Sequence, residues 1–177
     1  MILKNLNNKK GFTLVELLLV IAILGVAVGV TTDILLSLVR SYSKTQVIND
    51  IEQNANFATS KLETELRDAI SVTDVSNPGS PEISLVLSNK TVNYKLENSE
   101  LLRSVDGTYQ NLTRNQAPSG VAISCGNIDG ISCFSVSPGS PTIVSYSFIF
   151  SQPSTITGDV FSESIETAGT IVIRNTY

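Results

Sequence analysis

A single carboxylate, Glu16, lies inside a long apolar stretch near the start of this 177-residue chain. The stretch runs from residue 12 to residue 30, and Lys9, Lys10 and Gly11 come directly before it. An ionised acid among apolar side chains costs several kcal/mol unless it is paired or protonated. The chemistry that this pattern allows is charge pairing. We therefore expect a partner to meet Glu16 inside the membrane or inside an assembly of such helices.

The composition argues against catalysis and against nucleic-acid binding. The chain has no His and no Trp, so the common nucleophile–base pairs and most catalytic zinc sites cannot be built. Its formal net charge is -4, whereas a nucleic-acid-binding protein needs a cationic surface. We expect a protein that is no enzyme, holds no cofactor or metal ion, and binds no nucleic acid.

The residues around Glu16 resemble the N-terminal signature of type IV pilins and of the pseudopilins of type II secretion. In that family a short basic leader ends in glycine, and an aromatic residue, a Thr-Leu-hydrophobe-Glu sequence and an apolar helix follow. The match here is Gly11-Phe12-Thr13-Leu14-Val15-Glu16. The resemblance implies that a prepilin peptidase cuts after Gly11 and that the new terminus, Phe12, is N-methylated.

The resemblance also implies how Glu16 is used. Cleavage creates a cationic amine on Phe12, and a helical stack of subunits places that amine beside Glu16 of a neighbouring copy. Two charges that are each unfavourable when buried alone become tolerable as a hydrogen-bonded pair. A snorkelling or protonated acid without a role is the alternative. Packing around the pair would come from Leu14, Leu17, Leu18, Ile21 and Leu24.

The same resemblance implies the partners and the location of the protein. The partners are other pilin or pseudopilin subunits, the prepilin peptidase and N-methyltransferase, an inner-membrane assembly platform, and membrane lipid before assembly. Positive charge stays on the cytoplasmic side of a membrane. We expect a single pass through the cytoplasmic membrane, with the N-terminus inside and the body outside, and a periplasmic or extracellular filament after assembly.

The apolar stretch has the length of a membrane span. Residues 12–30 would form about 28 Å of helix, which suits a bilayer core of about 30 Å. Gly25 and Gly29 have the spacing that lets helices approach closely in membranes, and they lower helix propensity. Many family members have a proline a little further along the chain. This sequence has none there, so no sharp kink is predicted. Whether the helix unwinds between Gly25 and Asp33 on assembly is left as an open alternative. The alternative is an ordinary secretory signal that is cut after Gly29. Glu16 and the length of the apolar stretch argue against this alternative.

The sequence after the apolar stretch predicts that the helix continues as far as Ile70. Residues 40–70 contain no Gly and no Pro, and apolar residues recur there every three or four positions. This stripe suits docking on a sheet or a coiled-coil seam, and it consists of Val47, Ile51, Ala55, Ala58, Leu62, Leu66 and Ala69. The segment also resembles minor pilins and J-type pseudopilins. The matching residues are Asn54, Phe57, Ala58, Leu62, Leu66, Arg67 and Asp68.

The rest of the chain predicts an antiparallel β-sheet head, in one sheet or two. Its composition shifts to Ser, Thr, Asn, Gly and β-branched residues, with a loop at 77–81 and turns at Glu97-Asn98-Ser99 and Asp106-Gly107. We predict strands at residues 82–88, 91–96, 101–105, 142–150 and 170–173. In the fourth of these, Val144, Tyr146, Phe148 and Phe150 share one face.

These patterns divide the chain into four parts and predict an α+β fold. The parts are the leader (1–11), a transmembrane and polymerisation helix (12–39), the amphipathic half of that helix (40–71) and the β-rich head (72–177). The long helix would pack its amphipathic half on the antiparallel sheet, as in the pilin fold.

Two cysteines, Cys125 and Cys133, lie in the part that would be exported. In an oxidising compartment we expect them to form a disulfide, and two free thiols are the alternative. A zinc site is not expected because two thiols without His fall short of a tetrahedral ligand set. A calcium site using Asp129 and nearby carbonyls is a remote alternative.

Three functions remain for such a chain. The first is a structural subunit of a type IV pilus or a type II secretion pseudopilus, minor rather than major. The second is an adhesin or binding module tethered outside the membrane by an ordinary anchor and not assembled into a filament. The third, an exported enzyme, has no positive feature in the sequence.

Overall fold

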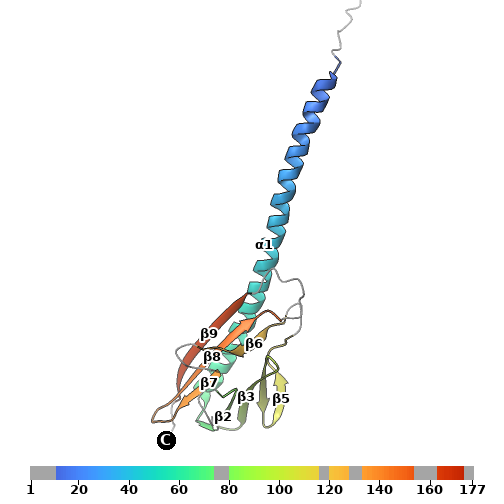
Figure 1. Cartoon of the computed structure of the whole chain (residues 1–177). Coiled ribbons are helices and arrows are strands. Elements are labelled where there is room, and N and C mark those ends of the chain that lie inside the picture. The colour runs from blue at the N-terminus through green and yellow to red at the C-terminus, as the bar shows by residue number, and fades with distance from the viewer. Residues whose placement is uncertain (1–10, 74–79, 116–119, 128–132, 154–162, 174–177) are drawn as a thin grey trace, which may run out of the picture. The chain divides into compact units, whose positions relative to one another are not determined.

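The computed structural model describes residues 11–73, 80–115, 120–127, 133–153 and 163–173, and it confirms the α+β fold (Figure 1). The chain divides into two compact units, residues 1–43 and 44–177. The elements are α1 (Leu14–Asp68), β1 (Ser71–Thr73), β2 (Glu82–Val86), β3 (Thr91–Glu97), β4 (Glu100–Val105), β5 (Thr108–Asn111), β6 (Ala122–Cys125), β7 (Cys133–Ser137), β8 (Thr142–Ser151) and β9 (Ser164–Ile173).

In the first unit, the described residues from Leu14 onward are all helical. The helix continues through Gly25 and Gly29 to the end of the unit, as expected for a segment without proline. The hydroxyls of Thr31 and Thr32 each donate to the carbonyl four residues earlier, at 2.7 and 2.8 Å. These bonds satisfy the hydroxyls within the helix itself. The segment from Gly25 to Asp33, for which unwinding on assembly was an open alternative, is thus regular helix in the single chain.

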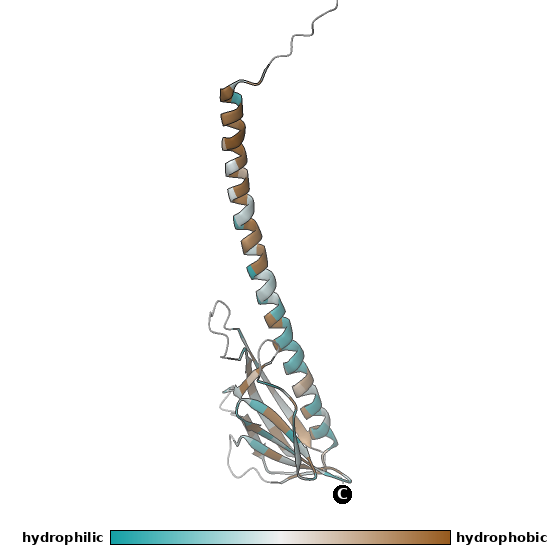
Figure 2. Ribbon diagram, turned by 90° about the vertical axis from the view of Figure 1, so that its right-hand side faces the viewer, coloured by the Kyte–Doolittle hydropathy of each residue, from teal (hydrophilic) through white to brown (hydrophobic). Residues whose placement is uncertain are grey.

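In the second unit, the apolar stripe of α1 is buried as predicted. Figure 2 shows the hydropathy along α1 changing from mostly brown turns after Leu14 to mostly teal turns before Asp68. The helix ends at Asp68, two residues before the predicted end. The cause is that the Ile70 amide donates to the carbonyl of Val86 in β2, at 2.8 Å, so the chain already pairs with a sheet there. The buried stripe residues are Ile51, Ala55, Ala58, Leu62, Leu66 and Ala69, with Val47 half-buried beside them.

The first sheet of the second unit contains five antiparallel strands in the order β1-β2-β3-β4-β5. Its two tightest turns are the ones that the sequence predicted. Asn98 and Ser99 connect β3 to β4, and Asp106 and Gly107 connect β4 to β5, all four with positive φ. Two-residue hairpins need such a backbone because its twist matches that of the strands.

The second sheet is built around the long strand β8. β9 pairs with the whole length of β8 on one side. On the other side β6 pairs with residues 148–151 and β7 with residues 143–147, so β6 and β7 follow one another along the same edge. The predicted strand at 170–173 was too short, since β9 begins at Ser164. Strands β1, β5, β6 and β7 were not predicted.

One hydrophobic core joins the helix to both sheets. The alternation predicted for β8 is confirmed, because Val144, Tyr146, Phe148 and Phe150 are all buried. The ring of Phe148 meets those of its neighbours, with centroids 5.2 to 6.4 Å apart, in arrangements that aromatic pairs favour. The sheets also touch through backbone bonds, such as that from the Ile123 amide to the Ser99 carbonyl at 2.9 Å. Most of the predicted loop at 77–81, and Asp129, lie outside the described residues.

Candidate functional site

The start of α1 is closed by two side chains that bond to each other's backbone. Thr13 precedes the first helical residue, and its hydroxyl accepts a bond from the Glu16 amide at 3.3 Å. In return, Glu16 Oε2 accepts from the Thr13 amide at 2.9 Å and from the Thr13 hydroxyl at 3.0 Å. This reciprocal arrangement is a capping box, which satisfies amides that a helix N-terminus leaves without partners.

The capping box adds to the expected pairing of Glu16, because it also gives the carboxylate partners within its own chain. In the single chain Thr13 already provides two donors to the carboxylate. The local sequence contained this information, because Thr followed three residues later by Glu before an apolar run is the signature of a capping box. The missed residue is therefore Thr13, whose type and spacing predict its role.

The peptide bond between Gly11 and Phe12 lies just before the helix. Neither residue is helical and both are exposed, with Phe12 exposed to 78%. An extended segment can offer its backbone amides and carbonyls to an enzyme, whereas those of a helix are already hydrogen-bonded to each other. The geometry at this bond is therefore compatible with enzymatic cleavage.

The apolar part of α1 is exposed along its whole length. The most apolar 18-residue segment of α1 has a mean hydropathy of 2.6. By its length and composition, the helix could therefore cross a bilayer. A Cβ added at Gly25 or Gly29 would meet nothing within 4 Å. Among the described residues of the first unit, nothing covers this surface, so lipid or other helices can. The predicted packing residues lie on it with exposures between 56% and 74%: Leu14, Leu17, Leu18, Ile21 and Leu24.

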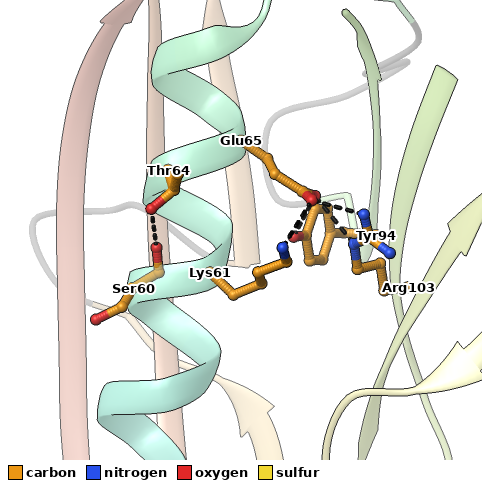
Figure 3. Close-up of polar contacts among 6 residues, drawn as sticks. All are labelled: Ser60, Lys61, Thr64, Glu65, Tyr94 and Arg103. Atoms are coloured by element: carbon orange, nitrogen blue, oxygen red, sulfur yellow. Dashed lines mark hydrogen bonds and ion pairs between the residues drawn. The ribbon is translucent and has the colours of Figure 1, made fainter. Parts of the chain in front are cut away.

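A second polar cluster lies in the other unit, where the buried Glu65 of α1 meets the first sheet (Figure 3). Arg103 on β4 donates through Nε to Oε2 at 3.0 Å and through Nη2 to Oε1 at 2.6 Å. The hydroxyl of Tyr94 on β3 donates to Oε2 at 2.7 Å. The ammonium of Lys61, one helical turn earlier, lies 3.3 Å from Oε1. Both oxygens of this acid are therefore fully used within the chain.

The Glu65 cluster shifts the ionisation of its members. Burial alone would raise the pKa of Glu65, but the bonds from Arg103 and Tyr94 outweigh it and hold that pKa below its ordinary value. Burial, together with the nearby carboxylate, raises the pKa of Tyr94. Tyr146 on β8 resembles Tyr94, because it is buried and donates to Glu63 at 2.7 Å, and its pKa is likewise raised. Glu63 and Glu65 thus connect α1 to both sheets.

The predicted disulfide between Cys125 and Cys133 is present. Cys125 ends β6 and Cys133 begins β7, so the bond joins the two strands that share one edge of β8. Beside it, Gly126 has no room for a side chain, since a Cβ would overlap Ser147 and the Glu166 carboxylate. Among the described residues there is no group of three Cys, Asp or Glu side chains that could hold a metal ion. The disulfide is a structural staple of the second sheet.

Comparison with known proteins identifies one part of the chain. Residues 6–32 match the family model described as the prokaryotic N-terminal methylation motif. This segment contains Gly11, Phe12, Thr13 and Glu16, the residues around the start of α1. No curated protein and no solved structure matches the chain.

Proposed function

We propose that the chain is a structural subunit of the type IV pilin and pseudopilin family that polymerises through α1, a proposal supported by the methylation motif at residues 6–32. The observation that carries the proposal is the methylation motif on an exposed apolar helix long enough to span a membrane. A helix of this kind, with one acid near its start, needs a membrane and then an assembly to cover it.

Processing would take place at the peptide bond between Gly11 and Phe12. A prepilin peptidase and N-methyltransferase on the cytoplasmic side would remove residues 1–11 and methylate the new amine. The exposed, non-helical backbone at this bond supports that proposal. The lysines before it would keep the N-terminus on the cytoplasmic side, while the head lies outside.

Assembly would use Glu16 as the partner of a neighbour's Phe12 amine. The charge pair fixes the register between subunits, whereas the apolar side chains and the open surfaces at Gly25 and Gly29 allow close packing of helices. Membrane lipid would cover this surface before assembly, and an inner-membrane assembly platform would move the subunit into the filament.

The type of subunit is proposed from the second half of α1. Residues 54–68 resemble minor pilins and J-type pseudopilins, and in this pattern Ala58 is buried whereas Phe57 is 58% exposed. Such an exposed aromatic side chain on the head unit suits contact with another subunit more than packing within its own core. The resemblance of residues 54–68, together with the strand-rich head, is why we favour a minor subunit that primes or caps a type IV pilus or a secretion pseudopilus.

The mature N-terminus tests the proposal. The full chain should be expressed with and without a prepilin peptidase and analysed by intact mass and N-terminal sequencing. With the peptidase, the mature chain should begin at N-methylated Phe12. A chain that starts after Gly29 would indicate a secretory signal, and an uncut chain in the presence of active peptidase would indicate a plain anchor with a tethered binding module. Either result would refute the processing on which the proposed function depends.

A further inference from the structure

We propose that Thr13 is a positioning residue that holds the Glu16 carboxylate ready for the charge pair between subunits. This inference rests on the proposed function, because it concerns how the pairing acid is oriented before a neighbour arrives. It gives the capping box a role beyond starting the helix, because Thr13 would influence assembly through its bonds to Glu16.

The geometry of the two carboxylate oxygens supports this role. Both donors of Thr13, its amide and its hydroxyl, bond to Oε2, at 2.9 and 3.0 Å. Among the described residues nothing donates to Oε1. The capping box therefore anchors one oxygen to the helix of its own chain and leaves the other as an acceptor. A neighbouring amine can bond to Oε1 while the bonds to Thr13 remain.

Anchoring matters because Glu is a long side chain with several rotatable bonds. A free carboxylate at the start of a membrane helix would sample orientations toward water and would lose that freedom on pairing. An acid that is already fixed by its own chain loses less freedom, so the same charge pair gives a larger net gain. Thr13 thus acts on assembly through Glu16 without touching the neighbour's amine.

Three variants separate the hydroxyl of Thr13 from the charge of Glu16. Thr13→Val keeps the shape and the amide but loses the hydroxyl, whereas Thr13→Ser is the matched control that keeps the hydroxyl. Glu16→Gln keeps the length and one acceptor oxygen of the side chain, so it can still cap the helix, but it loses the charge. Each variant is made in the full chain in the cell that assembles it.

The assay follows incorporation into sheared filaments while subunit expression is varied. Incorporation is expressed relative to processed subunits only, so that a slower cleavage does not affect it. Loss of one hydrogen bond to a charged group should raise the subunit level for half-maximal incorporation of Thr13→Val by about tenfold, equivalent to about 1.4 kcal/mol. The maximal incorporation should be unchanged, and Thr13→Ser should stay within about twofold of the wild type, less than 0.5 kcal/mol.

The outcomes distinguish the two proposals. If Glu16→Gln fails to incorporate and Thr13→Val behaves as the wild type, the positioning role is wrong and the charge pair stands. If Thr13→Val and Thr13→Ser are equally impaired, the hydroxyl is not the cause and the positioning role is again wrong. If Glu16→Gln itself incorporates normally, the charge pair of the proposed function fails, and the positioning role fails with it.

Discussion

The contact between α1 and the first sheet should depend on the carboxylate of Glu65. Glu65→Ala removes the acceptor for Tyr94, Arg103 and Lys61 at once. Breaking a buried ion pair by removing one partner costs about 3–5 kcal/mol because the other charge stays buried. The side chain of Arg103 is 18% exposed and can recover some hydration. We therefore expect the free energy of unfolding to fall by about 3 kcal/mol, the lower end of that range.

Urea unfolding of the fragment 44–177 measures this change. The fragment contains every residue of the hydrophobic core. Because the chain has no Trp, unfolding is followed by near-ultraviolet circular dichroism of the buried tyrosines, Tyr94 and Tyr146. With an m-value of about 1.5 kcal/mol/M, a loss of about 3 kcal/mol lowers the midpoint by about 2 M.

The control for Glu65→Ala is Glu52→Ala, which removes an exposed acid from the same helix. An exposed substitution of this kind should change the free energy of unfolding by less than about 0.5 kcal/mol. In addition, the double variant Glu65→Ala/Arg103→Ala should lose less free energy of unfolding than the sum of the two single variants. The reason is that the double variant leaves neither charge of the pair without its partner. If Glu65→Ala destabilises the fragment no more than Glu52→Ala does, the reasoning about this cluster is refuted.

Two further predictions concern pH and redox state. Since the pKa of Glu65 is lowered in the folded chain, its contribution is present above the ordinary value of 4.5 and is lost as the pH falls through the folded pKa. In the Glu65→Gln variant, the free energy of unfolding should therefore fall less steeply as the pH is lowered. The raised pKa values of Tyr94 and Tyr146 should make stability fall as the pH rises above their ordinary value of 10.0, and replacing both with Phe should remove that fall. Reducing the disulfide, which closes a separation of 8 residues, should lower the free energy of unfolding by about 2.5 kcal/mol; an unchanged urea midpoint with a thiol reductant would contradict the staple role.

The sequence predicted those elements whose burial follows a regular period. The stripe on α1 repeats every three or four residues, and β8 alternates between apolar and polar residues, so both were predicted with their buried faces. The first half of β9 could not be predicted in this way. Apart from Ile165, its residues are small or polar, and their strand conformation follows from pairing with β8 along its whole length. β5 is likewise exposed throughout, so no alternation marks it.

The Glu65 cluster could not be predicted from the sequence because its members are distant from one another in the chain. Glu65 and Arg103 are 38 residues apart, and Glu65 and Tyr94 are 29 apart. On the helix, Glu65 lies within the apolar stripe, where a period search finds no reason to place an acid. Only the docking of α1 on β3 and β4 brings the three side chains together. By contrast, Thr13 and Glu16 are three residues apart, so their bonds were predictable from local sequence.

Two of the acids of α1, Glu16 and Glu65, differ in how many of their oxygens are bonded within the chain, and this difference supports a structural role for Glu65 and the proposed assembly role for Glu16. Glu65 uses both of its oxygens on Arg103, Tyr94 and Lys61, so it holds the helix on its own sheet and has nothing to offer to another molecule. Glu16 uses Oε2 on Thr13 and leaves Oε1 as an acceptor in the part of the chain that the structure describes. Glu16 is exposed in the single chain, so an open acceptor becomes unfavourable only where a membrane or a neighbouring helix covers it and provides no donor. The proposed pairing with a neighbour's amine would provide that donor to Oε1, while Oε2 stays bonded to Thr13.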